Sequence, residues 1–279
     1  MPKITLDLSD DLFLQLQKRS NATGESTDRI VTTALNRVLD MPVHTIFQVS
    51  TSGALVEGIY ERAVSTKILP NYGDFGIGTF DNLDGEMVVL DGDIYQVRSD
   101  GTVNKIVDDT GTPFAVVVHF IADRDEVIME ANSFEILRSI CDRYRDSANL
   151  FYAFRIDGVF DQVHTRAMRA TTEGLAKAAA AQPEFHFKNT RGTLVGIWAP
   201  EFAGSLNIAG YHFHFLSDDR KEGGHLLDCS GKNLRVRVER LTDFHLCLPE
   251  TEEFLRADLT KDPSKDLEYA EQAHKKDNA

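Results

Sequence analysis

The chain has 279 residues, enough for one large domain or two of moderate size, and 42% of them are hydrophobic. Its 44 acidic residues outnumber its 30 basic ones, so the formal net charge of -14 disfavours binding to nucleic-acid phosphates or to an anionic membrane surface. The N-terminus lacks the apolar core of a signal peptide and no long apolar stretch follows, which predicts a soluble, cytoplasmic protein without a membrane span.

The first 42 residues predict a short strand followed by two helices. Apolar and polar residues alternate over residues 4–8, as they do on a half-buried strand. Ser9 is placed to cap a first helix that ends within residues 21–24, and a second helix with one apolar face begins near Ser26. A segment of this size cannot bury its own apolar faces, so we expect it to dimerise or to dock on another surface.

This N-terminal segment resembles the ribbon-helix-helix repressors, whose paired strands read the major groove of DNA. Asp7 lies on the outward face of the predicted strand, and Glu25 and Asp28 lie around the start of the second helix, where that family has basic or neutral polar groups. The segment contains five basic and six acidic residues. The sequence therefore favours dimerisation or docking by residues 1–42 over binding to an operator.

The pattern from Val43 onward is mainly that of β-strands. Asp-Gly turns at residues 84–85, 91–92 and 100–101 are spaced as in antiparallel hairpins. Helical spacing appears around residues 133–145 and 168–181. The sequence predicts an α+β domain over residues 43–279, dominated by antiparallel or mixed sheet and ending in a charged tail.

Two histidines stand two residues apart in the aromatic run of residues 210–215. On a strand, this spacing points the imidazoles of His212 and His214 to one face. A Gly-Gly pair at residues 223–224 predicts a hairpin turn that returns His225 beside them. Three neutral imidazole nitrogens with an open coordination position are typical of a catalytic zinc site, although three histidines alone also suit iron or copper.

The remaining histidines and the cysteines carry weaker signals. Aromatic-flanked histidines on a strand also occur as satisfied core groups, which is the reading that a lone histidine would receive. Six further histidines show no comparable grouping, and we expect structural or surface roles for them: His44, His119, His164, His186, His245 and His274. Three widely spaced cysteines argue against a disulfide framework or a thiolate metal site: Cys141, Cys229 and Cys247.

Six strings, in order along the chain, closely resemble the α-acetolactate decarboxylase family. They are GDFGIGTF at 73–80, LDGE at 83–86, NLFYA at 149–153, RIDG at 155–158, RGTLVG at 191–196 and GYHFHF at 210–215. The resemblance extends from about His44 to Glu271, so the ribbon-helix-helix-like segment lies outside it. Many ordered strings over about four-fifths of the chain make it specific.

The resemblance implies an enzyme of acetoin and butanediol biosynthesis that decarboxylates 2-acetolactate to acetoin, with 2-aceto-2-hydroxybutyrate as a second substrate. It also implies a barrel-like α+β fold, usually dimeric, with one Zn²⁺ ion and no organic cofactor. The zinc ligands carry over to His212, His214 and His225. The other active-site residues implied are Thr79, Glu86, Arg166 and Glu271. Glu271 belongs to a C-terminal tail that reaches the active site in the family, and here the tail departs from the usual family pattern.

The implied chemistry needs these residue types. Loss of carbon dioxide from acetolactate leaves electrons that must settle on the ketone oxygen, and a bound dipositive ion would stabilise the resulting enediolate. Arg166 would orient the departing carboxylate, and Glu86 or Glu271 would return a proton to one face and set the product's handedness. Two alternatives remain, namely a metabolite-sensing DNA-binding or assembly protein and a zinc hydrolase of unknown substrate.

Overall fold

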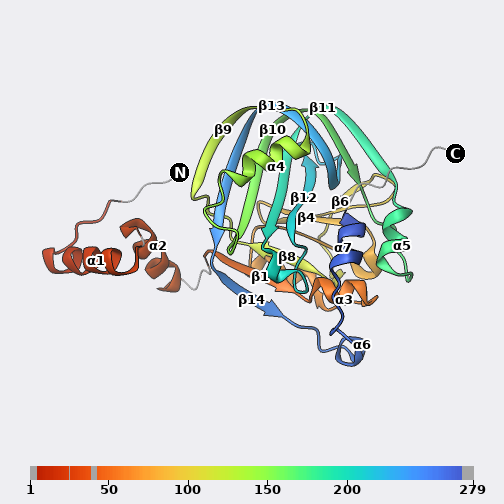
Figure 1. Ribbon diagram of the computed structural model, residues 1–279, viewed down its shortest axis with the longest axis horizontal. Coiled ribbons are helices and arrows are strands. Elements are labelled where there is room, and N and C mark those ends of the chain that lie inside the picture. Colours follow the sequence, from red (N-terminus) through yellow and green to blue (C-terminus); the bar gives the residue numbers. More distant parts are fainter. Residues whose placement is uncertain (1–4, 25, 39–42, 272–279) are drawn as a thin grey trace. The chain divides into compact units, whose positions relative to one another are not determined.

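The computed structural model describes residues 5–24, 26–38 and 43–271 (Figure 1). The chain divides into two units, Met1–Val43 and His44–Ala279, each of which is described by itself. Among the described residues, no helix is both long and apolar enough to cross a membrane.

The described residues of the N-terminal unit form two helices, α1 (Asp10–Thr23) and α2 (Thr27–Val38). Ser9 caps the start of α1 by accepting a hydrogen bond from a backbone N–H, and Gly24 ends the helix with a left-handed φ of 74°. Both predicted helices are therefore confirmed. The prediction of a strand over residues 4–8 is wrong for residues 5–8, which lie outside any strand, and residue 4 falls outside the described part. A strand needs a partner strand for its backbone hydrogen bonds, and one copy of the segment offers none.

The larger unit contains a seven-stranded sheet with the strand order β14-β1-β8-β3-β4-β5-β6. β1 is parallel to β14, and the other neighbours in this sheet are antiparallel. The strands are β1 (Thr45–Val49), β3 (Phe75–Thr79), β4 (Glu86–Leu90), β5 (Asp93–Val97), β6 (Val103–Lys105), β8 (Ala115–Val118) and β14 (Asp243–Cys247).

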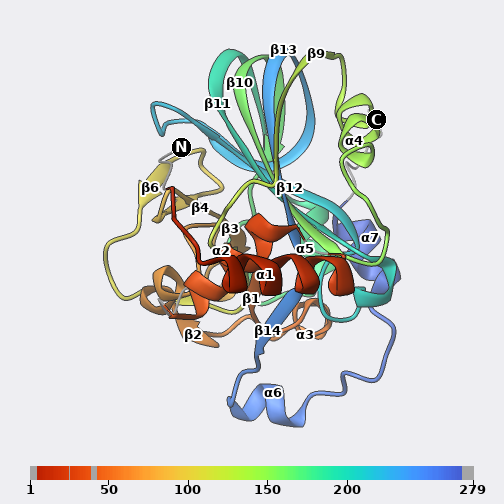
Figure 2. The same cartoon turned by 90° about the vertical axis from the view of Figure 1, so that its left-hand side faces the viewer.

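A second sheet has five strands in the order β10-β11-β12-β13-β9, and β10 also pairs with β13. Figure 2 shows its long strands rising above the strands of the other sheet. They are β9 (Arg124–Ala131), β10 (Phe151–Arg166), β11 (Glu184–Ala199), β12 (Gly210–Ser217) and β13 (Gly223–Leu241). The predicted sheet-rich α+β fold is confirmed, whereas the barrel-like form stays a prediction.

The remaining elements are short and connect or cover the sheets. Five helices are α3 (Ser52–Val56), α4 (Phe134–Asp142), α5 (Leu175–Ala180), α6 (Glu252–Arg256) and α7 (Ser264–Glu271). Three 3₁₀ turns are η1 (Thr66–Asn71), η2 (Asp81–Leu83) and η3 (Glu201–Ala203), and a two-stranded ribbon joins β2 (Val64–Ser65) to β7 (Gly111–Thr112).

The helix predicted over residues 133–145 is confirmed by α4, but the one predicted over residues 168–181 is too long. Only α5, at Leu175–Ala180, is helical there. The segment before α5 is non-helical, and the Met168 N–H donates to the Glu86 carboxylate instead of joining a helical turn. A tertiary hydrogen bond therefore overrides the helical spacing of this segment.

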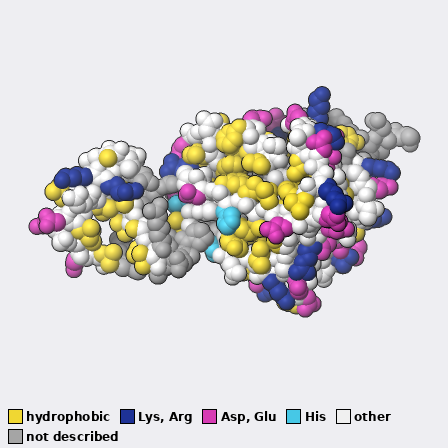
Figure 3. Space-filling model, turned by 90° about the horizontal axis from the view of Figure 1, so that it is seen from below, with side chains coloured by type: hydrophobic (Ala, Val, Ile, Leu, Met, Phe, Trp, Pro, Cys, Tyr) yellow, Lys and Arg dark blue, Asp and Glu magenta, His cyan; other side chains and the backbone are white. Residues whose placement is uncertain are grey.

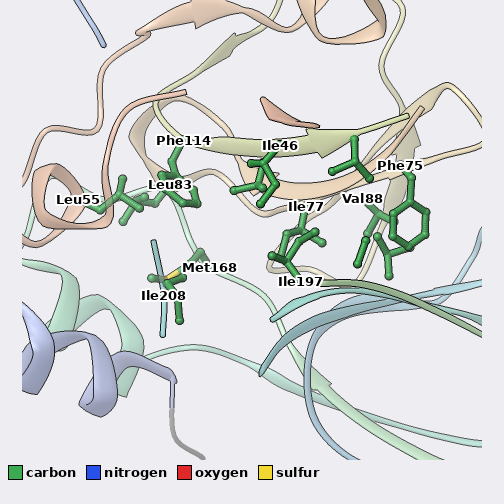
Figure 4. Close-up of a cluster of buried hydrophobic side chains, with 14 of the residues drawn as sticks. Ile46, Leu55, Phe75, Ile77, Leu83, Val88, Phe114, Met168, Ile197 and Ile208 are labelled. Atoms are coloured by element: carbon green, nitrogen blue, oxygen red, sulfur yellow. The ribbon is translucent and has the colours of Figure 1, made fainter. Parts of the chain in front are cut away.

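Each face of the five-stranded sheet has its own hydrophobic core. One core includes buried residues of α4 together with Phe213 and Phe215 of β12. The other packs residues of this sheet, such as Ile197, against Ile77 and Val88 of the seven-stranded sheet, as Figure 4 shows. Because side chains alternate along a strand, the residues of β12 between and beside these phenylalanines point into the layer between the two sheets.

Candidate active site

Three histidine rings converge in the layer between the sheets. His212 and His214 share the inner face of β12, and His225 lies directly opposite His214 in the β12–β13 ladder. The Nε2 atoms of His212 and His214 are 3.0 Å apart, and His225 Nδ1 lies 3.2 Å from His212 Nε2. The predicted convergence of the three imidazoles is confirmed.

The glycine before His225 is needed for this convergence. Gly224 has a φ of 128°, and a Cβ atom at this position would lie 2.6 Å from the Arg166 carbonyl oxygen. β13 can approach β10 here only without a side chain, since both the backbone conformation and the space require glycine. The predicted return of His225 on a hairpin is confirmed, but the turn itself lies at residues 218–222, and Gly223 and Gly224 already pair with β12 at the start of β13.

His212 and His214 present neutral nitrogens. Burial lowers the pKa of His212 to about 3 and lowers the pKa of His214 well below its usual value, with the nearby positive charge of Arg166 acting in the same direction. His214 Nδ1 lies 2.8 Å from the Met87 carbonyl oxygen. Because a carbonyl only accepts, Nδ1 carries the proton and Nε2 keeps its lone pair.

This set of nitrogens fits a metal ion. Ligand atoms about 2.0 Å from a tetrahedral Zn²⁺ are roughly 3.3 Å from one another, close to the observed separations. All three side chains are buried, and their ligand atoms lie within 4.8 Å of one another. The Met87 carbonyl supplies the kind of outer hydrogen bond that orients a metal-bound imidazole.

A carboxylate from the other sheet lies against the histidines. Glu86 begins β4 and is only 6% exposed. Its Oε2 atom is 3.4 Å from His214 Nε2, and its Oε1 atom accepts a hydrogen bond of 2.9 Å from the Met168 N–H. The Met168 N–H therefore holds the carboxylate in place, with its second oxygen directed toward the cluster.

Thr79 supports the turn that presents this carboxylate. It pairs with Glu86 across β3 and β4, and its hydroxyl donates to the Gly85 carbonyl oxygen over 2.8 Å. Gly85 has a φ of 92°, which favours glycine. Thr79 also lines the same pocket as Glu86.

Arg166 is the last residue of β10 and lies opposite His225 in the β10–β13 ladder. Its side chain is buried, and its Nη2 atom donates to the Ala270 carbonyl oxygen of α7. α7 ends at Glu271, whose side chain lies outside the described part of the chain. The arginine therefore joins the C-terminal helix to the site.

One pocket contains the polar groups and is closed by apolar side chains. Thr79, Glu86, Arg166, His212 and His225 all line it. Figure 4 shows part of the apolar wall, which comes from several separate elements. The wall consists of Leu55, Leu83, Phe114, Met168, Leu175, Ile208 and Leu267.

Sequence reasoning missed several contributors to this site. The Met87 carbonyl and the Met168 amide act through the backbone, which carries no side-chain signal. The apolar wall residues look like any core positions until the fold brings them together. The prediction that the other six histidines show no comparable grouping also missed His164 and His186, which stack on each other beside Glu184 and could hold a metal ion with it.

Comparisons with known proteins agree over the larger unit. The model of the family described as alpha-acetolactate decarboxylase matches residues 46–261. The chain is 38% identical to the alpha-acetolactate decarboxylase of Bacillus subtilis, covering 83% of this chain and 92% of that one, and 36% identical to that of Methanosarcina mazei, covering 90% and 87%. It superposes on a crystal structure of the Bacillus subtilis protein with a TM-score of 0.79 and 36% identity, covering 82% and 100% of the two chains.

Proposed function

Because the chain belongs to the alpha-acetolactate decarboxylase family and is an acetolactate decarboxylase, we propose that it converts 2-acetolactate to acetoin and carbon dioxide in a Zn²⁺-dependent reaction in the cytoplasm. The homologous 2-aceto-2-hydroxybutyrate is the second substrate. The observation that carries this proposal is the convergence of three buried imidazoles at a pocket that Glu86 and Arg166 also line.

The metal would be held by His212 and His214 through Nε2 and by His225 through Nδ1. When bound, it supplies a Lewis acid that stabilises the negative charge developing on oxygen as carbon dioxide leaves. The hydrogen bond from His214 to the Met87 carbonyl keeps the ligand nitrogen deprotonated and the ring fixed.

Arg166 binds and orients the substrate carboxylate. A guanidinium group offers two parallel N–H donors that match a carboxylate, and this one is buried in the pocket that contains the histidines. Its contact with the Ala270 carbonyl oxygen fixes one end of the group. The carboxylate is therefore held in one orientation until the carbon–carbon bond breaks.

Glu86 holds and delivers the proton that replaces the lost carboxyl group. Its carboxyl group lies beside His214 and is anchored by the Met168 N–H, so it meets the substrate from a single side. Protonation from one face gives one enantiomer of acetoin. Glu271, at the end of α7, is the second acid that we propose for the site, and Thr79 positions the turn before Glu86.

The apolar wall of the pocket contacts the two methyl groups of acetolactate and excludes water. Leu83, Phe114 and Ile208 belong to this wall. A pocket that excludes water strengthens the electrostatic interactions of Arg166 and of the metal with the substrate, because little water is present to screen them.

Metal removal tests the proposal directly. We expect the purified full-length chain to release carbon dioxide and acetoin from acetolactate, to lose at least about a hundredfold in rate after chelation, and to recover when Zn²⁺ is added. Product release and elemental metal content are measured on the same samples. Full activity in protein shown to be metal-free would refute the zinc mechanism, and cleavage of esters with no action on acetolactate would favour the zinc-hydrolase alternative.

For the N-terminal unit we propose a role in homodimer formation. Several apolar side chains of its helices are exposed, and Figure 3 shows apolar side chains at the surface of this unit. They include Leu12, Phe13, Leu14, Leu35 and Val38. Exposed apolar groups of this density on two small helices favour a second copy as the partner that covers them.

The mass of the full-length protein in solution tests this role. The double variant Leu12→Asp/Leu35→Asp is expected to shift the protein from dimer to monomer in light scattering, because it places charge on the apolar surface. Leu255→Asp, which changes a 71% exposed leucine of α6 in the larger unit, is the matched control and is expected to keep the dimer. A dimer in both variants would contradict the proposal, and salt-dependent DNA binding by the wild-type protein would instead favour the DNA-binding alternative.

A further inference from the structure

A second group of side chains of the kind that bind metal ions lies where β10 ends and β11 begins. His164 and His186 are directly opposite each other in the ladder, and their rings stack with centroids 4.1 Å apart. Glu184 precedes His186 by two residues and so shares its face of the sheet, and its Oε2 atom is 2.9 Å from His164 Nε2. Two imidazoles and one carboxylate therefore meet on one face of two paired strands.

The spacing of these groups suits a transition-metal ion. One ligand atom from each side chain lies within 4.8 Å of the other two. The two rings are stacked 18° from parallel, so they must turn about their side-chain bonds before all three atoms reach the roughly 3.3 Å that tetrahedral zinc ligands require. The His164 and Glu184 side chains are 24% and 27% exposed, and His186 is exposed, so they can make such rotations and water can complete the coordination. Two histidines and one glutamate are a common zinc ligand set.

An ordinary surface ion pair explains less of this arrangement. A partly exposed contact between His164 and Glu184 contributes little to stability, and it gives no reason for a second histidine ring on top of the first. A site for a cation accounts for all three side chains at once. The pairing of β10 with β11 also fixes their Cα positions, which reduces the entropy lost when an ion binds.

This group is separate from the catalytic histidines, but its residues are neighbours of Arg166 in the β10–β11 ladder. Arg166 follows His164 by two residues on β10, and it lies opposite Glu184 in the β10–β11 ladder. The group shares no ligand with the cluster of His212, His214 and His225.

We propose that His164, Glu184 and His186 bind a second divalent transition-metal ion, with Zn²⁺ as the preferred ion, in addition to the ion at the catalytic histidines. The second ion has two imidazole ligands and one carboxylate ligand, and water fills the remaining positions. Binding at this site does not depend on the decarboxylase activity.

Counting bound zinc in untagged, full-length protein tests the proposal. Chelator-treated wild-type protein is titrated with Zn²⁺ alone, and zinc is counted by equilibrium dialysis with elemental analysis. We expect two ions per wild-type chain and one in the variant His164→Ala/His186→Ala. We also expect one in His214→Ala, where the remaining ion belongs to the new site. Glu184→Gln keeps an acceptor but removes the negative charge, so it is expected to weaken the second binding step by about tenfold or more.

A thermal readout separates this site from the catalytic one. Zn²⁺ is expected to raise the Tm of His214→Ala protein, because an ion that binds only the folded state stabilises it. The same addition to a variant that combines His214→Ala with His164→Ala/His186→Ala is expected to leave the Tm unchanged. Equal zinc content in wild type and His164→Ala/His186→Ala would overturn the proposal. If only His214→Ala keeps the wild-type zinc content, the assignment of His214 as a ligand of the catalytic ion fails, and the proposal of the second site stands.

Discussion

Replacing His214 with alanine is expected to lower kcat/KM for acetolactate by about a thousandfold or more. The change removes the ligand that is oriented by the Met87 carbonyl and lies 3.4 Å from the Glu86 carboxylate. Two imidazoles would then hold the catalytic ion weakly, and the charge that develops on oxygen would lose its main stabilisation. Carbon dioxide release at saturating and limiting substrate, with zinc content measured on the same protein, checks this result.

Two further variants guard against a trivial loss of folding. His214→Gln keeps most of the side-chain volume in a position that is 1% exposed, so it should fold while it still loses activity. His245→Ala changes a histidine that packs against Phe47 and Tyr72 instead of the cluster, and it is expected to keep wild-type turnover. Wild-type kcat/KM in a folded His214→Gln protein would show that this ring is not a catalytic ligand.

Substitution of Glu86 by glutamine is expected to reduce kcat by roughly 10²–10⁴-fold, the usual contribution of a positioned acid or base. Glutamine has almost the same shape, and its carbonyl oxygen can still accept the hydrogen bond from the Met168 N–H. The Tm should therefore change little while the transferable proton is lost. Steady-state kinetics and thermal unfolding of the same preparation test both halves of this expectation.

The handedness of the product gives a second and independent measure of the Glu86 role. Residual acetoin made by Glu86→Gln is expected to be close to racemic, because water then protonates both faces. Glu271→Gln is the comparison, since its residue lies at the end of α7 next to Ala270, which contacts Arg166. A single enantiomer from Glu86→Gln together with racemic product from Glu271→Gln would transfer the proton-delivery role to Glu271.

The metal cluster could be predicted from the sequence because its spacing is local. Two histidines separated by one residue on a strand share a face whatever the rest of the fold does, and Phe213 takes the opposite face as the alternation requires. A short hairpin then brings His225 back opposite His214. These steps need only the geometry of two neighbouring strands.

The rest of the site depends on contacts between distant parts of the chain. Glu86 follows an Asp-Gly turn like other turns in the sequence, so only the family resemblance distinguished it. Arg166 reaches the site because β10 continues to the point where it faces β13, and the length of a strand is set by its partners. His164 and Glu184 meet only through the register of a long ladder, which the separate sequences of the two strands do not specify.

The parallel pairing of β1 with β14 affects how this chain can be synthesised. Residues 45–49 leave the ribosome well before their partners at residues 243–247. Until then one side of β1 has unpaired backbone groups, which invite pairing with another nascent chain. Expression of a fragment that stops before residue 243 should therefore give aggregates, and slower translation of the residues between these two strands should lengthen the period during which β1 lacks its partner.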